Sequence, residues 1–218
     1  MTGAKMILWH CLNARSFRPL WTMAEMGLDC DLRILPFPPR FLKREYLEEN
    51  PLGTIPLLVD GDTRMTESPA ISHYLATRYG PHPVAVAADE PDYGAYLNWL
   101  FHGEATLTFP QTVYLRYTRF EPEERRIPQA AEDYRKWFLA RMRLLEATVA
   151  DGRQFLCAER FTNADISVGY AVMLADNLKI GDEIGPATRA WWEGLKQRPS
   201  YRAAKDAQKK AAAEQGVA

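Results

Sequence analysis

The sequence has 218 residues, 47% of them hydrophobic and 25% charged, which is typical of a soluble globular protein with one large or two small domains. Its 27 Lys and Arg balance its 28 Asp and Glu, so no basic excess favours nucleic acid or an anionic membrane as a partner. No apolar run approaches a membrane span and the first residues lack a signal-peptide pattern, so we expect a cytoplasmic protein.

The first part of the chain alternates between strand and helix patterns. The expected elements are a strand (5–10), a helix (from 15 or 16 to 27), a strand (31–35) and a short polar helix (41–49). Pro19 is tolerated in the first turn of the helix, and Gly27 ends it. A strand–helix–strand unit implies two parallel strands with a right-handed crossover.

The stretch from Asn50 to Ser68 reads NPLGTIPLLVDGDTRMTES and predicts a hairpin. Pro56 precedes the apolar run 57–59 and therefore belongs at the start of a strand, where its missing N–H is tolerated. We expect the Ile55–Pro56 bond to be cis. Asp-Gly-Asp at 60–62 is a tight-turn signal, and residues 63–66 form the return strand.

A helix start follows the hairpin directly. Ser68 is expected to cap this helix, with Pro69 at its first position, and the helix extends to Gly80. Free N–H groups at such an end attract a carboxylate, and Glu67 beside it is suited to an ammonium. The pattern therefore fits a site for a small zwitterionic peptide, and the alternative is a hairpin that merely leads into a capped helix.

The second part of the chain carries almost no strand signal. Gly80-Pro81-His82-Pro83 has the composition of a linker. Helices are expected at 89–117, 127–150, 164–178 and 188–198, with a weaker one at 200–213. Thr162 and Asp165 predict a capping box, with Phe161 packing on Ile166 as a hydrophobic staple.

These motifs together resemble the cytosolic glutathione S-transferases, in particular a bacterial type with Ser or Asn in the active-site loop. The residues that carry the resemblance are Asn50, Pro51, Gly53, Pro56, Leu58, Glu67 and Ser68, together with the capping box. The resemblance implies a thioredoxin-like, glutathione-binding domain at 1–80 and a linker at 81–88. It also implies an all-helical domain at 89–218 that lines the site of an electrophile.

By the same resemblance, the loop after the first strand activates the thiol of glutathione, the co-substrate. Ser16 and Asn13 are the two candidate hydrogen-bond donors, and the Ala-Arg-Ser-x-Arg run at 14–18 slightly favours Ser16. The alternatives are a plain helix cap at Ser16 and a turn residue at Asn13. Arg15 stands where one bacterial class has a reactive cysteine, which argues against a covalent disulfide step. Arg18 either faces the site or covers the helix.

Further binding residues follow from the resemblance. The backbone of Ile55, before Pro56, is expected to pair with the cysteinyl unit, and Glu67 and Ser68 to hold the γ-glutamyl end. Arg40 or Lys43 would reach the glycyl carboxylate, although both are also ordinary surface charges. An aromatic run forms either core or the electrophile wall: Trp99, Phe101, Phe109, Tyr114, Tyr117 and Phe120.

The remaining reactive side chains predict neither a metal site nor a redox site. Cys11, Cys30 and Cys157 form no close pair, and none of the four histidines has metal-ligand spacing. Together with this observation, the resemblance implies a homodimeric glutathione transferase without a metal, which attacks small hydrophobic electrophiles in detoxification. The alternatives are peroxide reduction, disulfide thiolysis, ether cleavage or isomerisation, or a non-catalytic module that binds glutathione or another ligand.

Overall fold

The computed structural model describes residues 5–217, and the chain forms two compact units. One comprises Met1–Ala85 together with Gln197–Ala218, and the other comprises Val86–Lys196. The change near Ala85 falls within the linker expected from the sequence. Residues 197–218, however, join the first unit, whereas the sequence placed them in the helical domain. Residues 1–4 and 218, at the ends of the expected domains, lie outside the described residues.

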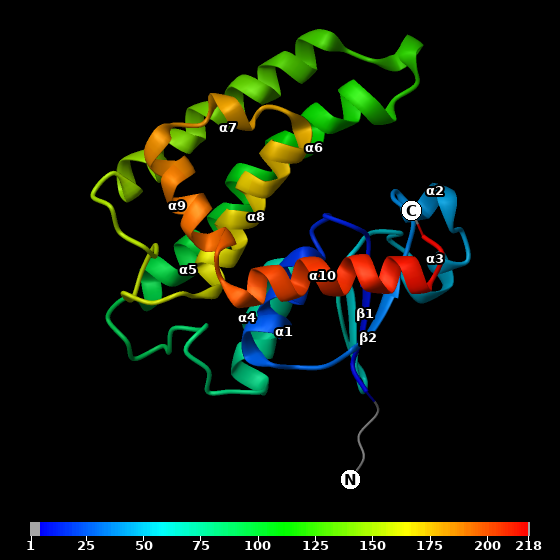
Figure 1. The fold of residues 1–218 in the computed structure, drawn as a ribbon. Helices are drawn as coiled ribbons and strands as arrows, with labels where there is room; N and C mark the ends of the chain where they lie inside the picture. The colour runs from blue at the N-terminus through cyan, green and yellow to red at the C-terminus, as the bar shows by residue number, and fades with distance from the viewer. Residues whose placement is uncertain (1–4, 218) are drawn as a thin grey trace. The chain divides into compact units, whose positions relative to one another are not determined.

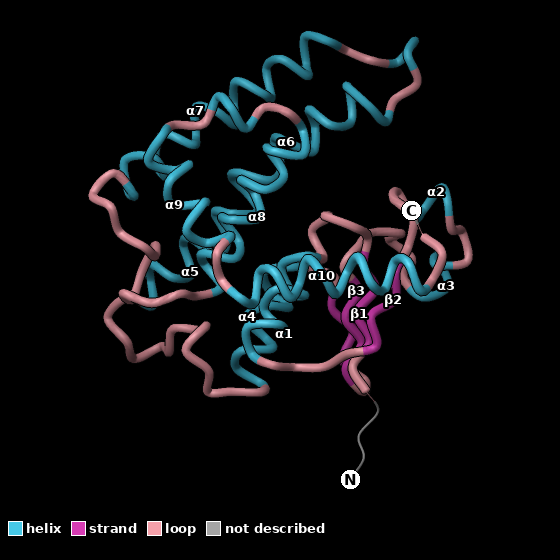
Figure 2. The backbone as a smooth tube through the Cα atoms, viewed as in Figure 1, coloured by secondary structure: helices cyan, strands magenta, loops and turns pink. Residues whose placement is uncertain are grey.

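The first unit is built on a four-stranded sheet with the order β2-β1-β3-β4 (Figure 2). Its strands are β1 (Ile7–His10), β2 (Asp31–Ile34), β3 (Leu57–Asp60) and β4 (Thr63–Met65). β1 and β2 are parallel and are joined through α1 (Phe17–Met26), while β3 is antiparallel to both β1 and β4. This arrangement confirms the predicted thioredoxin-like domain and its hairpin.

The two faces of the sheet follow from the alternation of side chains along each strand. Trp9 and Leu57 pack in one cluster with Tyr46, whose ring centroid lies 5.2 Å from that of Trp9. Leu8 and Leu58 are fully buried and point to the opposite face. The helices α1 and α4 (Ser68–Arg78) contact each other. Each face of the small sheet is thus covered.

The segment expected as one polar helix at 41–49 forms two single turns instead, α2 (Pro39–Leu42) and α3 (Tyr46–Glu49). Pro39 opens the first turn, and Lys43 leaves helical geometry with φ −145° and ψ 74°. The break allows Tyr46 to turn into the core, where it is 2% exposed. Burial of this ring explains why the polar pattern did not continue as one helix.

The last helix, α10 (Pro199–Glu214), packs on α1 and β2 within the first unit (Figure 1). Its buried residues lie on one side of the helix: Ser200, Ala204, Gln208, Ala211 and Ala212. Trp21 Nε1 donates to Ser200 Oγ at 3.0 Å near the start of the helix. Just beyond the end of α10, the Gln215 carboxamide bonds the backbone of β2. Gln215 Nε2 donates to Leu32 O, and Ile34 N donates to Gln215 Oε1, each at a distance of 2.8 Å. A stripe of small residues allows this close approach.

All the regular elements described in the second unit are helices, joined by loops. Its helices are α5 (Tyr93–Phe101), α6 (Phe109–Leu115), α7 (Pro128–Val149), α8 (Asn163–Leu178) and α9 (Pro186–Lys196), with shorter turns η1 (His102–Thr108), η2 (Arg116–Phe120), η3 (Glu123–Arg125) and η4 (Gly181–Glu183). The predicted helix 89–117 therefore begins at Tyr93 and contains π-helical turns. No described helix combines the length and the hydropathy that a membrane crossing needs.

The capping box at the start of α8 is present as predicted. Ala164 N donates to Thr162 Oγ1 at 3.2 Å, and Thr162 N donates to Asp165 Oδ2 at 2.8 Å. Asp165 Oδ1 also accepts a hydrogen bond from Leu156 N at 2.9 Å. The fully buried carboxylate therefore fixes both the helix start and the loop before it.

We expect Asp165→Ala to lower the free energy of unfolding by about 2–4 kcal/mol, because two buried backbone N–H groups lose their acceptor. Urea denaturation measures the change. Asp133→Ala is the matched control, since Asp133 is exposed and bonds only the Gln129 side chain, and a change within about 0.5 kcal/mol is expected there. Equal effects of the two substitutions would contradict the role of Asp165.

Candidate functional site

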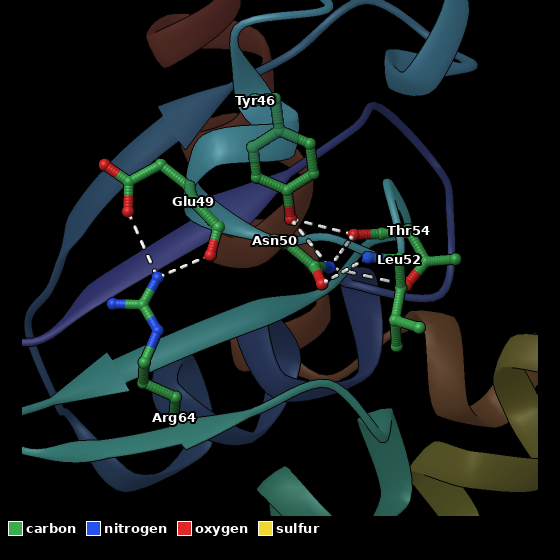
Figure 3. Close-up of polar contacts among 6 residues, drawn as sticks. All are labelled: Tyr46, Glu49, Asn50, Leu52, Thr54 and Arg64. Atoms are coloured by element: carbon green, nitrogen blue, oxygen red, sulfur yellow. Dashed lines mark hydrogen bonds and ion pairs between the residues drawn. The ribbon is translucent and has the colours of Figure 1, made fainter.

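The turn before β3 is held by the buried side chain of Asn50 (Figure 3). Asn50 Nδ2 donates to Thr54 O at 2.8 Å, and Asn50 Oδ1 accepts from Leu52 N at 3.1 Å. The Tyr46 hydroxyl also donates to Thr54 O, at 2.8 Å. Two donors on one carbonyl fix the direction in which the chain leaves the turn, and this sets the position of Ile55.

Ile55 and Pro56 form a stretch of backbone directly before β3, and this stretch is called the backbone edge below. Their peptide bond is cis, as predicted from the sequence. β3 pairs with β1 only from Leu57 onward, and no described residue bonds the backbone N–H or C=O of Ile55. Such unpaired groups can accept an extended peptide as an added strand.

Gly53 places α2 close to this edge. It has a φ of +59°, and an added Cβ there would lie 2.7 Å from Arg40 Cβ. Only glycine fits both the conformation and the space. Arg40 is therefore next to the turn, with its guanidinium 4.6 Å from the Phe41 ring centroid. Lys43 is also exposed and lies 3.9 Å from Glu45.

Ser68 is the first residue of α4, and Glu67 takes the cap position, one residue earlier than predicted. Glu67 has an extended backbone and makes no side-chain cap bond, and its side chain is exposed. The reason is Arg18: this fully buried residue donates from Nη1 to Ser68 Oγ at 3.1 Å and draws the hydroxyl inward. A guanidinium only donates, so the hydroxyl hydrogen of Ser68 stays available to an acceptor. The unpaired N–H groups of the first turn add positive potential.

The loop after β1 is tied to α10 through Asn13. Asn13 has a φ of 56°, a left-handed conformation that asparagine tolerates well. Its Oδ1 accepts from Lys205 Nζ at 2.6 Å and from Gln208 Nε2 at 2.9 Å. Its backbone N–H donates to Gln208 Oε1 at 3.1 Å. The Asn13 carboxamide is thus held with its oxygen toward α10.

Gln208 also determines the state of His10. Gln208 Oε1 lies 2.9 Å from His10 Nε2, so that ring nitrogen carries the proton and donates. Burial lowers the pKa of His10 from 6.5 to about 4, against the opposing effect of the Gln208 hydrogen bond. The imidazole is therefore neutral near pH 7 and acts as a buried structural donor.

Ser16 has a different role in the same loop. It is fully buried, and its Oγ accepts from Cys11 N at 3.2 Å and lies 3.5 Å from Cys11 O. The hydroxyl makes no cap bond to α1. Cys11 itself is buried, and desolvation raises the pKa of its thiol to about 12, so it is not a reactive thiolate. Ser16 closes the loop, whereas Asn13 stands at its partly exposed edge.

Sequence reasoning left out Lys205 and Gln208 and left the role of Arg18 open. One signal was present in the sequence, because Gln208 repeats the spacing of the alanine stripe on α10 and a polar residue on a buried face needs a partner. Nothing in the sequence identified that partner as a loop nearly 200 residues earlier. Within the described residues, no three His, Cys, Asp or Glu side chains group together as metal ligands.

Comparisons with known proteins agree with this geometry. Residues 14–78 match the family model described as "Glutathione S-transferase, N-terminal domain". Glutathione S-transferase 3 of Schizosaccharomyces pombe is 21% identical over 215 residues, which covers 91% of this chain and 86% of that protein. Glutathione S-transferase 3 of Zea mays is 26% identical over 202 residues, covering 87% and 88%.

Solved structures share the fold along nearly the whole chain. Glutathione transferase Ure2p6 from Phanerochaete chrysosporium, in complex with oxidized glutathione, aligns with a TM-score of 0.81 and 25% identity over 96% of this chain and 98% of that one. Ure2p5 from the same organism, cocrystallized with 1-(S-glutathionyl)-2,4-dinitrobenzene, aligns with a TM-score of 0.79 and 24% identity over 98% of both chains. These findings confirm the resemblance to the cytosolic glutathione S-transferases, while the bacterial type stays a prediction.

The buried His10 predicts a specific pH dependence of stability. Between pH 6.5 and about 4 the unfolded chain binds a proton on His10 that the folded chain does not. Protonation of His10 therefore costs no stability above pH 6.5. As the pH drops below 6.5, it lowers the free energy of unfolding by up to about 3 kcal/mol. The measurement is the free energy of unfolding against pH in the wild type and in His10→Gln, which keeps a donor for Gln208. The difference between the two curves should change across this window, and parallel curves would contradict the assignment.

Proposed function

We propose that this chain, which carries a glutathione S-transferase N-terminal domain and the glutathione transferase fold, is a glutathione transferase that acts on small hydrophobic electrophiles. One observation carries the proposal most directly. The region matched by the family model, 14–78, contains both the unpaired backbone edge at Ile55 and the Arg18–Ser68 pair at the start of α4. A peptide edge and an anion site in one small unit are what a zwitterionic tripeptide requires.

Glutathione is held along this edge by complementary groups. The backbone of Ile55, fixed before cis-Pro56, pairs with the cysteinyl unit as an added strand. The Ser68 hydroxyl and the free N–H groups of α4 bind the γ-glutamyl carboxylate. Glu67 is exposed and binds the γ-glutamyl ammonium. These roles rest on the geometry of the free protein and on the family pattern.

The glycyl carboxylate needs a cation at the other end of the edge. Arg40 is favoured over Lys43, because Arg40 lies directly against Gly53 in the turn that leads to Ile55. Lys43 is next to Glu45, which neutralises part of its charge. The turn residue Thr54 is exposed but uncharged and leaves this role to Arg40.

Asn13 is the favoured thiol donor. Its oxygen is engaged by Lys205 and Gln208, while its Nδ2 group bonds no described residue and remains available to sulfur. The Ser16 hydroxyl is buried and turned to Cys11, so the slight preference of the sequence pattern for Ser16 finds no support in the geometry. A donor that binds the thiolate lowers the pKa of the thiol and raises the concentration of the nucleophile.

The proposed reaction is a nucleophilic substitution or addition. The thiol releases its proton to water, and the thiolate sulfur forms a bond to an electrophilic carbon. In a substitution, the bond to the leaving group breaks and this group departs with the electron pair. In an addition, a π bond of the electrophile breaks and the resulting anion takes up a proton from water. The conjugate named in the Ure2p5 structure has glutathione joined through sulfur to dinitrobenzene. An aromatic halide is therefore the first substrate to test.

A turnover assay separates this function from its alternatives. The protein is incubated with glutathione and an aromatic halide, a peroxide or a mixed disulfide, and reactions without protein serve as the control. Conjugation of the halide supports the transferase. Activity with only the peroxide or disulfide favours the other glutathione-dependent reactions. Binding of glutathione by calorimetry without any turnover indicates a non-catalytic module, and absence of binding rejects the proposal.

Four broader properties also remain part of the proposal. They are a cytoplasmic location, a role in detoxification, a bacterial-type active-site loop and a homodimeric assembly. Exposed aromatic side chains on each unit support an assembly, since Phe41 is 64% exposed and Phe101 and Phe109 are each 54% exposed. The aromatic run of the second unit otherwise stays a prediction for the electrophile wall. Light scattering that gives the mass of a monomer at micromolar concentration would reject the dimer.

Ser68→Ala is expected to weaken glutathione binding by roughly 1–2 kcal/mol, the scale of one hydrogen bond to a charged group. Calorimetry measures the affinity. Thr77→Ala, in the last turn of the same helix, is the control and should bind like the wild type. Unchanged affinity in folded Ser68→Ala would remove the anion site from the proposal.

Asn13→Ala and Ser16→Ala are expected to differ. Asn13→Ala should raise the pKa of the thiol of bound glutathione by about one unit, equivalent to ~1.4 kcal/mol, because the thiolate loses its hydrogen-bond donor. Ser16→Ala should chiefly lower protein stability and leave this pKa nearly unchanged. Thiolate absorbance against pH measures both variants. A larger shift in Ser16→Ala would restore Ser16 as the donor, and no shift in either would leave the activation to the backbone or to Arg15.

A further inference from the structure

Two side chains of α10, Lys205 and Gln208, converge on the carboxamide of Asn13. They are three residues apart and therefore lie on the same face of the helix. Both donate to Asn13 Oδ1, from Nζ at 2.6 Å and from Nε2 at 2.9 Å. All three residues belong to the same compact unit. The loop after β1, which holds the proposed thiol donor, is thus contacted by α10. No residue of α10 belongs to the sequence motifs that predicted the site.

The chemistry of these donors permits one orientation of the Asn13 carboxamide. An ammonium group only donates, so the atom that faces Lys205 must be the oxygen. The backbone N–H of Asn13 also only donates, so Gln208 turns its own oxygen toward it and its Nε2 toward Asn13 Oδ1. His10 Nε2 donates to the same Gln208 oxygen and supports this arrangement. The Nδ2 group of Asn13 must therefore face away from α10.

Lys205 also brings a positive charge close to this amide. It is partly buried and has no acidic partner among the described residues. Its Nζ lies 5.6 Å from the centroid of the Phe17 ring, within the range of a cation–π contact. A cation bound to the amide oxygen draws electron density from the amide and makes its N–H a stronger donor.

We propose that Lys205 and Gln208 are positioning residues for the reaction of the proposed enzyme: they aim the Nδ2–H of Asn13 at the glutathione sulfur, and the charge of Lys205 on the carboxamide oxygen makes that N–H a stronger donor to the thiolate. This inference rests on the proposed function, with Asn13 as the thiol donor. Each acts through the carboxamide of Asn13, so neither needs to touch glutathione.

The titration of the bound thiol must be distinguished from that of the titratable side chains around Asn13. On β1, His10 has a pKa of about 4, and in the loop Cys11 has a pKa of about 12. Arg15 of the loop stays charged. On α10, burial and the nearby Lys209 lower the pKa of Lys205 below its ordinary value.

The test compares Lys205→Gln with Lys205→Arg and with Lys210→Gln. Lys205→Gln removes the charge and keeps a donor, and Lys205→Arg restores the charge. Lys210→Gln removes an exposed lysine of the same helix that is paired loosely with Glu214 at 3.9 Å. The readouts are the thiolate absorbance of bound glutathione against pH, and the pH profile of kcat/KM for the aromatic halide.

Lys205→Gln should reduce the thiolate fraction and kcat/KM roughly three- to tenfold below the thiol pKa, and the loss should disappear at high pH. Lys205→Arg should recover most of the loss, and Lys210→Gln should match the wild type. The dissociation constant for S-methylglutathione, which has no thiol to ionise, should stay within about twofold in all variants. A merely structural role would weaken binding and would not move the pH profile.

Two further measurements separate the failure of this inference from failure of the function. In an Asn13→Ala background, Lys205→Gln should have little additional effect, because it acts through Asn13. In the absence of any ligand, the side-chain amide resonance of Asn13, identified by its loss in Asn13→Ala, should shift in Lys205→Gln and Gln208→Met. If the protein binds no glutathione, the function fails while this resonance still tests the positioning. An unchanged resonance and an unchanged thiol titration in Lys205→Gln would overturn the inference.

Discussion

The structure of the first unit depends on a simple constraint, namely that two donors at the end of β1 and in the loop after it, His10 Nε2 and the backbone N–H of Asn13, need an acceptor. Gln208 meets this constraint at one point, because its oxygen accepts from both His10 Nε2 and the backbone of Asn13. Its amide nitrogen then has one acceptor within reach, Asn13 Oδ1. The helix α10 is therefore part of the thioredoxin-like unit in the physical sense, since removing it would leave a buried histidine and the Asn13 carboxamide without the partners that α10 supplies.

The same logic sets the two ends of the proposed peptide site. Asn50 fixes the carbonyl of Thr54 and so leaves the next backbone groups, at Ile55, free to pair with a ligand. Arg18 occupies the oxygen of Ser68 and so leaves the hydroxyl hydrogen free. In each case a buried polar side chain holds one group in place by a hydrogen bond and leaves a hydrogen-bonding group beside it unpaired. For the proposed binding of glutathione, groups that are already held in place lower the entropic cost.

Local signals explain how much of this could be predicted from the sequence. The hairpin at 57–65, the cis bond before Pro56 and the capping box at Thr162 depend on residues close in the chain, and the structure has all three. The fold class followed from the order of these elements. The place of α10 did not, because its alanine stripe fits a helix in either unit and its partners, Trp21 and Leu32, are distant in sequence. The shift of the α4 cap to Glu67 likewise depends on Arg18, a contact between two helices.

The choice between Ser16 and Asn13 shows why residue type alone was insufficient. Both are hydrogen-bond donors in the loop before α1, and both fit the pattern of the active-site loop in the glutathione transferases. A hydroxyl has one hydrogen, and the hydroxyl of Ser16 lies against the backbone of Cys11 inside the loop. A carboxamide has an acceptor at one end and two donors at the other, so it can bind α10 with its oxygen and still offer an N–H. In the proposed function, asparagine at position 13 binds α10 through its oxygen and the thiol through its nitrogen, whereas a serine there would have to accept from α10 and donate to sulfur through a single atom.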